Sequence, residues 1–285
     1  CNSNLNINIH NNFSIKIFRP FIKKILLKII CKSDDIIICD SWKSLNAVPK
    51  INNKIFVLAH GQEFLSKEKK FKRIKKSLSR ASCIICSSNY TASLIDELKV
   101  TDIKRIVIPP TYSVEKLSKR KKGSTKNSEM VFLLTICRLE QRKGILPVLR
   151  CLSNLYKNKL LKPFQWNICG EGLELEEIRE NIKKLNLSQQ VFLVGKINNN
   201  LKQKFLESSD VFVMPSYKVN QSVEGFGISY VEAAAYRIPS IAGLEGGVSD
   251  AVIDSKTGWC VNPLNKDQLA NVLKEAINNK DIRQK

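Results

Sequence analysis

The sequence predicts an α/β protein made of two doubly wound domains, each with a parallel sheet covered by helices on both faces. Short apolar runs alternate with stretches of helical periodicity along the chain, which is typical of parallel sheets. A charged segment without apolar period, residues 115–128, separates two such series and reads as a linker. The 285 residues suffice for two domains of ordinary size. We therefore expect an N-terminal domain with its linker at 1–128 and a C-terminal domain at 129–285.

In the N-terminal domain, three helical stretches alternate with the apolar runs. Residues 15–32 place Phe18, Phe21, Ile22, Ile25, Leu26 and Ile29 on one face with lysines around the rest, so this helix can pack on a sheet or lie on a membrane. Residues 66–80 are strongly basic, and residues 90–98 form a short helix with Asn89 or Thr91 as its cap. The strands are expected at Asp35–Asp40, Lys54–His60, Ala81–Ser87 and Lys104–Pro110.

The C-terminal domain repeats the alternation of strands and helices. Strands are expected at Val131–Cys137, Phe164–Cys169, Val191–Val194, Val211–Met214, Ser240–Ala242 and Trp259–Val261. Helices are expected at Ile145–Tyr156, Leu173–Leu185, Asn199–Ser208 and Lys266–Asn278.

Most of the formal charge of +21 lies in the first half of the chain. Residues 1–128 hold 26 Lys and Arg against 9 Asp and Glu, whereas residues 129–285 hold 21 against 17. This asymmetry indicates a basic face that meets something anionic, either nucleic acid or a lipid surface, although part of it can be compositional bias. Segments 15–32 and 66–80 are the candidates for peripheral contact with an anionic membrane.

The scattered cysteines are typical of a reduced cytosolic protein, because most of the nine lie singly inside apolar runs. Cys83 and Cys86 have CxxC spacing, but they lie on an expected strand and lack a second ligand pair. No metal site is predicted.

The stretch EGFGISYVEAAAYRIP, Glu224 to Pro239, has the pattern of a loop, a glycine turn and a helix. Glycines ahead of a helix leave its first N–H groups free, and these groups carry the positive end of the helix dipole, which suits a phosphate. Glu224 precedes the helix and Glu232 lies inside it, so both carboxylates can reach one crevice. A carboxylate can accept hydrogen bonds from the paired hydroxyls of a ribose.

Other polar residues fall at the carboxyl ends of the expected strands, where doubly wound sheets bind their ligands. Arg138 and Lys143 follow the first strand of the C-terminal domain, Gly170 and Gly172 follow the second, and Glu224 follows the fourth.

Five ordered blocks resemble the donor-binding half of the retaining GT-B glycosyltransferases of family four, the group 1 type. They are RLEQRKG at 138–144, GEG at 170–172, SDVFVMPS at 209–216, the stretch at 224–239, and Gly246-Gly247 with Thr257-Gly258. HGQE at 60–63 and residues 81–88 extend the resemblance more weakly into the first half. The fold implied is GT-B, two Rossmann-like domains with parallel sheets facing each other across a cleft.

The resemblance also implies roles for individual residues. Arg138 and Lys143 match the basic pair that holds the donor diphosphate, Glu232 the ribose-binding glutamate, and Glu224 the glutamate near the transferred sugar. His60 matches a histidine at the active-site face of the acceptor domain. The remaining donor-binding positions implied are Gly170, Ile197, Gly225, Phe226, Gly227 and Ile228.

The implied reaction transfers a sugar from a nucleotide-diphosphate sugar to a glycan or lipid-linked acceptor hydroxyl with retention of configuration. Arg138, Lys143 and the helix terminus would stabilise the leaving diphosphate, so no cofactor and no metal are expected. The pathway expected is synthesis of cell-surface polysaccharide, lipopolysaccharide or glycolipid. The place expected is the cytoplasm, with peripheral contact to the inner face of the plasma membrane.

Some positions depart from the family's pattern. Cys137 and Arg237 stand where glycines are usual, and Pro110-Thr111-Tyr112 replaces Asn-Gly-Val. The chain starts without the family's first strand and glycine-rich loop and stops before its closing helices, so we expect a fragment.

Two alternatives remain open. A GT-B enzyme of another reaction, a phosphorylase or a nucleotide-sugar epimerase, is not excluded by the pattern. A nucleic-acid-binding module would explain the charge, but aromatic residues are not interleaved with the basic runs and no known reader motif appears, so no nucleic acid is expected.

Overall fold

The computed structural model divides the chain into two compact units. Unit 1 comprises residues 1–59, 67–85 and 95–106, and unit 2 comprises residues 60–66, 86–94 and 107–285. The predicted linker lies outside the described residues, and the predicted domain boundary at 128/129 stays a prediction. The structure describes residues 19–65, 68–100, 103–112 and 129–284.

A four-stranded sheet forms the centre of unit 1, with strand order β1-β2-β3-β4. β1 and β2 run parallel, with Ile37 opposite Ile55. Alternate residues of both strands are buried, as the apolar runs predict for a sheet. The strands are β1 (Ile36–Cys39), β2 (Lys54–Ala59), β3 (Cys83–Cys86) and β4 (Lys104–Val107).

Four α-helices are described among these strands: α1 (Arg19–Ile30), α2 (Trp42–Leu45), α3 (Glu68–Leu78) and α4 (Asn89–Glu97). The cap predicted for α4 was wrong. Ser88 caps this helix, because its hydroxyl accepts a hydrogen bond from the Thr91 N–H at 3.0 Å. A helix cap precedes the first helical residue. The helix was predicted to begin at Tyr90 but begins at Asn89, so the predicted cap positions were too late in the sequence.

The apolar stripe of α1 is only partly covered. Phe21 is 65% exposed, Ile25 45% and Ile29 74%, whereas Ile22 and Leu26 are half-buried, and Phe18 lies outside the described residues. Packing of this helix on a sheet, one of the two expectations for it, therefore stays a prediction.

Unit 2 is built on a six-stranded parallel sheet with strand order β10-β9-β8-β5-β6-β7. Its strands are β5 (Val131–Ile136), β6 (Phe164–Cys169), β7 (Val191–Gly195), β8 (Val211–Met214), β9 (Ser240–Ala242) and β10 (Gly258–Cys260).

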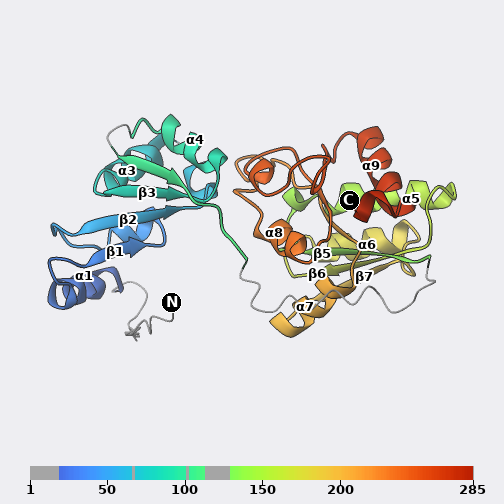
Figure 1. The fold of residues 1–285 in the computed structure, drawn as a ribbon, viewed down its shortest axis with the longest axis horizontal. Helices are drawn as coiled ribbons and strands as arrows, with labels where there is room; N and C mark the ends of the chain where they lie inside the picture. Colours follow the sequence, from blue (N-terminus) through green and yellow to red (C-terminus); the bar gives the residue numbers. More distant parts are fainter. Residues whose placement is uncertain (1–18, 66–67, 101–102, 113–128, 285) are drawn as a thin grey trace. The chain divides into compact units, whose positions relative to one another are not determined.

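Helices cover both faces of this sheet, as predicted (Figure 1). One core joins Leu133, Trp166 and Val213 of the strands to buried leucines and isoleucines of α5 (Ile145–Lys157), α6 (Leu175–Lys184) and α9 (Lys266–Asn278). The other core joins Leu134 and Phe212, which are the sequence neighbours of Leu133 and Val213 on the same strands, to α7 (Asn199–Ser208) and α8 (Ile228–Ala235). Because side chains alternate along a strand, neighbouring residues serve opposite cores.

None of the helices in the described ranges is both long and apolar enough to cross a bilayer. Cys83 and Cys86 are buried at the two ends of β3. Among the described residues, no group of three or more His, Cys, Asp or Glu side chains could hold a metal ion. The predicted independence of metals stays a prediction.

Candidate functional site

The site lies where the strand order of the unit 2 sheet reverses. From β5 the chain proceeds to β6 and β7 on one side, and then returns to place β8 on the other side of β5. At such a switch point the loops that leave two neighbouring strands diverge and open a crevice at the carboxyl ends. The loop after β5 carries residues 137–144, and the loop after β8 carries residues 215–227.

Close backbone contacts fix these loops. A Cβ on Gly144 would lie 2.2 Å from the Pro215 carbonyl oxygen, so the loops after β5 and β8 touch at a position where only glycine fits. The loop after β6 is tied to the loop after β5, because the Leu139 N–H donates to the Glu171 carbonyl at 2.9 Å. Three strand ends therefore present one rigid surface.

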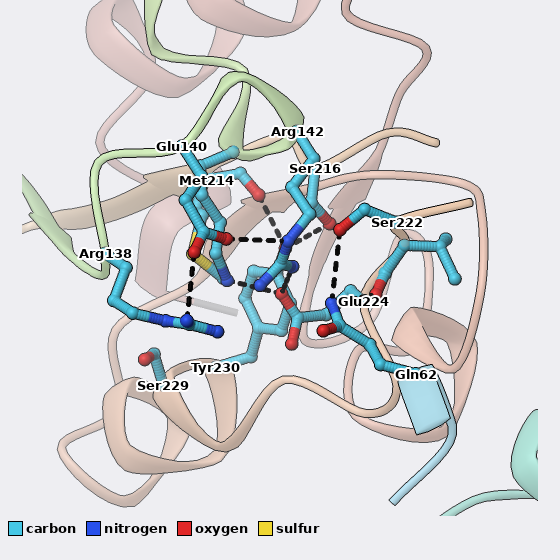
Figure 2. Close-up of polar contacts among 12 residues, drawn as sticks. Gln62, Arg138, Glu140, Arg142, Met214, Ser216, Ser222, Glu224, Ser229 and Tyr230 are labelled. Atoms are coloured by element: carbon cyan, nitrogen blue, oxygen red, sulfur yellow. Dashed lines mark hydrogen bonds and ion pairs between the residues drawn. The ribbon is translucent and has the colours of Figure 1, made fainter. Parts of the chain in front are cut away.

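Glu224 holds the two loops at the switch point together through a buried ion-pair cluster. Its Oε2 atom accepts from Arg142 Nη1 at 2.8 Å and from Lys143 Nζ at 2.5 Å. The side chains are 14%, 5% and 8% exposed, so the charges are largely desolvated. Figure 2 shows the Arg142 side chain between Glu140 and Glu224.

Glu140 continues the cluster outward. Its carboxylate accepts from Arg142 Nε at 3.0 Å through one oxygen and from Arg138 Nη1 at 3.0 Å through the other. The Arg138 side chain is 70% exposed, and its guanidinium can therefore reach a ligand without breaking a buried contact. The three cations exceed the two carboxylates by one charge, so the cluster favours an anion.

Burial raises the pKa of Glu224, but Lys143 and Arg142 outweigh burial and hold the pKa of this carboxyl below its usual range. Glu224 is therefore ionised at neutral pH. Burial raises the pKa of the neighbouring Cys137 thiol to about 12, so Cys137 stays a neutral thiol rather than a nucleophile.

The turn that starts α8 has the predicted glycine geometry. Gly227 adopts φ +99° next to the buried Tyr230 ring, where a Cβ would lie 2.3 Å from the ring. The Phe226 side chain is 5% exposed, which leaves only its backbone for a ligand, whereas Ile228 is 53% exposed. The Tyr230 hydroxyl donates to the Met214 carbonyl at 2.5 Å and so fixes the helix start against β8.

Glu232 lies in the second turn of α8 and pairs with Lys202 of α7. Lys202 Nζ donates to Glu232 Oε1 at 2.7 Å, with the side chains 22% and 13% exposed. The same ammonium lies 5.9 Å from the centre of the Tyr112 ring. Tyr112 and Ile197 both pack against the hydrophobic core that includes Tyr230 and Ala233 of α8.

The backbone before and after Glu224 is held by residues from segments 60–66 and 86–94 of unit 2. Gln62 Nε2 donates to the Val223 carbonyl at 2.9 Å, and Ser88 Oγ donates to the Gly225 carbonyl at 2.7 Å. His60 is exposed, and its backbone carbonyl lies so close to Gly225 that a Cβ there would come within 2.1 Å.

The structure thus brings together most of the residues predicted from sequence. Lys143 and Glu224 are in direct contact, Arg138 joins them through Glu140, and the turn at 225–228 follows Glu224. Gly170 begins the loop after β6, where a Cβ would lie 1.8 Å from the Cys137 carbonyl oxygen. Glu232 has no contact with this cluster and instead pairs with Lys202.

Two residues of the site were missed by the sequence reasoning. Arg142 is as buried as Lys143 and contacts the same carboxylate, that of Glu224. The only feature of the sequence that pointed to a role for Arg142 was its position beside Lys143 in the RLEQRKG block. Lys202 lies in a polar helix where nothing in the local sequence distinguishes it from Lys204.

Two curated relatives each match about half of the chain. Over 147 residues the chain is 29% identical to the GDP-mannose-dependent alpha-(1-6)-phosphatidylinositol monomannoside mannosyltransferase of Mycolicibacterium smegmatis, which covers 51% of the chain and 38% of the relative. A protein of Escherichia coli K12 named as a colanic acid biosynthesis glycosyltransferase, WcaL, is 26% identical over 160 residues, or 50% of the chain and 39% of that protein. The matched part thus amounts to well under two thirds of either relative.

Solved structures show the fold. Sucrose-phosphate synthase from Thermosynechococcus elongatus superposes with a TM-score of 0.78 at 20% identity, covering 94% of the chain and 71% of that protein. A TarM variant of S. aureus, solved with fondaparinux, alpha-GlcNAc-glycerol and UDP, gives 0.75 at 20% identity, covering 93% of the chain and 53% of that protein. The predicted GT-B fold class is confirmed.

The family model described as "Glycosyl transferases group 1" matches residues 116–285, which include the whole ion-pair cluster and both glutamates of α8 and its preceding loop. The match covers more than half of the chain and agrees with the resemblance in the five sequence blocks. The chain belongs to the glycosyl transferases group 1 family.

Proposed function

We propose that the chain forms part of an enzyme that transfers a sugar from a nucleotide-diphosphate sugar to an acceptor hydroxyl with retention of configuration. The observation that carries the proposal is the cluster of Lys143, Arg142 and Glu224 at the sheet's switch point, with Arg138 exposed beside it. A net positive cluster there suits a diphosphate, and the carboxylate beside it suits a sugar hydroxyl.

Each part of the donor has a residue of suitable chemistry. Arg138 and Lys143 bind diphosphate oxygens by charge-assisted hydrogen bonds, helped by the N-terminal turn of α8. Glu232 accepts hydrogen bonds from the ribose hydroxyls, and Ile197 with the backbone near it contacts the base. Glu224 Oε1 accepts no hydrogen bond from the described residues, so it is available to a hydroxyl of the transferred sugar.

The reaction breaks the bond from the anomeric carbon to the diphosphate oxygen and forms a bond to the acceptor oxygen. Negative charge grows on the diphosphate as it leaves, and the fixed cations stabilise it without reorganising. The acceptor attacks from the face that the diphosphate vacates, so the configuration is kept. The acceptor's proton ends on the diphosphate.

Catalysis without a metal follows from the same arrangement, because Arg138 and Lys143 supply the charge that a divalent cation would otherwise supply. Transfer that is unchanged in excess EDTA is the expected result. Loss of transfer in EDTA that Mg²⁺ restores would refute this part of the proposal.

The acceptor class proposed is a growing cell-surface glycan or a glycolipid, which includes lipopolysaccharide. Its support is the names of two relatives, one a phosphatidylinositol mannoside mannosyltransferase and one a colanic acid glycosyltransferase. A screen of lipid-linked and oligosaccharide acceptors with radiolabelled donor tests it, and transfer to neither class would contradict it.

Peripheral contact with an anionic membrane is proposed for the basic segments 15–32 and 66–80. Within their described parts, Lys24, Lys28, Lys72 and Lys75 are exposed. The apolar stripe of α1 also exposes Phe21, Ile25 and Ile29. We expect binding to anionic vesicles but not to neutral ones. Equal binding to both would refute an electrostatic contact.

The donor assignment is tested by thermal shift against a panel of nucleotide-diphosphate sugars, with the protein and its Glu232→Ala variant. One donor is expected to raise the melting temperature of the wild type, because ligands that bind only the folded state stabilise it. The variant is expected to lose most of this shift. A shift that survives the substitution unchanged would remove Glu232 from the ribose site.

A further inference from the structure

A second basic hollow lies in unit 1, apart from the residues of the donor site. It measures about 640 Å³ and is formed by α1, by α2 with the two residues after it, and by α3. Lys23 of α1, Lys43 of α2, and Lys70 with Arg73 of α3 line it, together with Trp42 and Asn46. This volume accommodates a phosphorylated small molecule or a lipid headgroup.

The charges that line this hollow are uncompensated. Four of its lining residues are cations, and no acidic residue lines it. None of the four cations takes part in an ion pair among the described residues. Cations that converge on one hollow repel each other, and an anion placed between them would remove that repulsion.

Among the neutral lining residues, Asn46 offers a donor to the hollow. Its Oδ1 accepts from Ser77 Oγ at 3.0 Å, which uses the acceptor of the amide and leaves its NH₂ group as a donor. Ser44 also lines the hollow, but its hydroxyl donates to the carboxylate of Asp40, which does not line it. The Trp42 indole N–H has no acceptor among the described residues, but this nitrogen is itself buried, so the donors that face the hollow are those of the four cations and Asn46.

The short helix α2 is held firmly, so the Asn46 donor at its end is preorganised. Arg80 donates to the carbonyl oxygens of Leu45 at 3.1 Å, Val48 at 2.7 Å and Pro49 at 2.8 Å, which ties down the end of α2. The bond from Ser77 to Asn46 joins α3 to the same end. The hollow therefore does not depend on the arrangement of exposed side chains alone.

We propose that this hollow in unit 1 binds a phosphate group that carries more than one negative charge, as a phosphate monoester or a diphosphate does. Four cations exceed what a single carboxylate needs, and amide and ammonium donors match the several acceptor oxygens of a phosphate. The phosphate can belong to a lipid headgroup or to a soluble molecule. The proposal does not require the sugar-transfer reaction, because its residues lie outside the cluster of Glu224.

Two double variants of the same helix separate a specific site from general attraction by charge. Lys70→Ala with Arg73→Ala removes two charges that line the hollow. Lys72→Ala with Lys75→Ala removes two charges from exposed positions of α3 that do not line it. All four residues are exposed, so both variants are expected to fold, and their melting temperatures provide the check.

The first probe is inorganic pyrophosphate, titrated calorimetrically into the protein and its variants in an Arg138→Ala background, so that the diphosphate site proposed in unit 2 contributes little to the signal. Saturable binding is expected. The affinity should fall roughly tenfold or more in the Lys70/Arg73 variant, because two direct charge-assisted hydrogen bonds to the ligand are removed. It should fall less than about twofold in the Lys72/Lys75 variant, which removes charge without removing a direct bond. Lys43→Gln, on a different helix, is expected to weaken binding as well.

The second probe is phosphatidylcholine vesicles containing phosphatidic acid, whose headgroup is a phosphate monoester. Both variants are expected to lose some vesicle binding, because segment 66–80 is proposed to contact anionic membranes. A loss that is at least several-fold larger in the Lys70/Arg73 variant than in the Lys72/Lys75 variant assigns the site to a headgroup. If pyrophosphate binding depends on Lys70 and Arg73 but vesicle binding does not, the site is assigned to a soluble phosphate. Equal losses in both variants, no loss in the Lys70/Arg73 variant, or no saturable binding of either probe overturns the proposal.

Discussion

Lys143 and Glu224 lie 2.5 Å apart through Nζ and Oε2, although 81 positions separate them in the sequence. Lys143 belongs to the loop after β5 and Glu224 to the loop after β8, so this bond closes the crevice between the two strands at its base. Arg142 shares the same carboxylate oxygen at 2.8 Å. Two cations on one buried carboxylate make the site sensitive to the protonation of Glu224.

Stability is therefore expected to fall in acid through Glu224. Its folded-state pKa is held below the ordinary value of 4.5, so the ion pair stabilises the fold above that value and the stabilisation is lost as pH falls through the folded pKa. Glu224→Gln is expected to lower the free energy of unfolding at pH 7 by about 3 kcal/mol, because buried Lys143 loses its carboxylate partner and buried Arg142 keeps only Glu140.

Urea unfolding of the wild type and Glu224→Gln at a series of pH values checks this expectation. The difference between the two should shrink as pH falls below about 4.5. A difference that stays constant down to pH 3 would show that folding does not lower the pKa of Glu224.

Arg142 and Arg138 are expected to behave in opposite ways, although four positions separate them. The Arg142 side chain is 5% exposed and binds two carboxylates, so Arg142→Met should cost about 3 kcal/mol of stability, because Glu224 and Glu140 lose a buried partner. The Arg138 side chain is 70% exposed, and Arg138→Ala should cost less than about 0.5 kcal/mol.

For donor binding, the larger effect is expected at Arg138 rather than at Arg142, because Arg138 is the more exposed of the two cations proposed to bind the diphosphate. Arg138→Ala should weaken donor binding about tenfold or more, as expected for the loss of a charge-assisted pair. Denaturant unfolding and donor titration of both variants test the two expectations together. A stability loss at Arg138 as large as at Arg142 would contradict the assignment.

Much of this site could be predicted from the sequence, because each buried parallel strand appears in the sequence as a short continuous run of apolar residues. The bounds predicted for Phe164–Cys169, Val211–Met214 and Ser240–Ala242 are those of β6, β8 and β9, and these strands set where Glu224 emerges. The resemblance in the loop blocks then identified which charged residues follow the strands.

The remainder depends on contacts between distant positions, which local patterns do not record. Arg142 is buried because Glu224, 82 positions away, and Glu140 compensate its charge, and neither periodicity nor propensity indicates this. Lys202 likewise depends on Glu232, which lies on another helix. The exposure of Ile25 and Ile29 on α1 is the converse case, since amphipathic periodicity predicts a face but not what covers it.

Lys202 is expected to affect donor binding more than turnover. It lies 2.7 Å from Glu232 and fixes one oxygen of the carboxylate proposed to bind the ribose. Lys202→Met should raise the donor KM several-fold, on the order of 1 kcal/mol, with kcat nearly unchanged, because the ribose lies away from the bond that breaks. Lys202→Arg should restore the KM, and Lys204→Met is the matched control on the same helix.

Steady-state kinetics with varied donor concentration measures these effects. A fall in kcat with an unchanged KM would place Lys202 with the reacting groups instead. An unchanged KM in both Lys202→Met and Lys202→Arg would show that its bond to Glu232 does not orient the ribose site.

Arg237 adopts the left-handed conformation at the end of α8, with φ +58°, in a position where glycine is favoured. The Ile238 N–H bonds to the Ala233 carbonyl at 3.1 Å and the Arg237 N–H to the Ala234 carbonyl at 2.8 Å, which is the double closure of a Schellman motif. The motif therefore forms with arginine in place of glycine, at the cost of backbone strain.

Arg237→Gly should accordingly stabilise the protein by about 1 kcal/mol, because glycine adopts this conformation without a Cβ clash. The expected rise in melting temperature is about 2–4 °C. Ala234→Gly, three positions earlier at an exposed position inside the same helix, should lower stability by about 1 kcal/mol, because there the freedom of glycine only destabilises the helix. Thermal unfolding of the two variants should thus give shifts of opposite sign. Two negative shifts would show that the strain that glycine relieves at Arg237 is smaller than the stabilisation that the arginine side chain contributes through its own interaction.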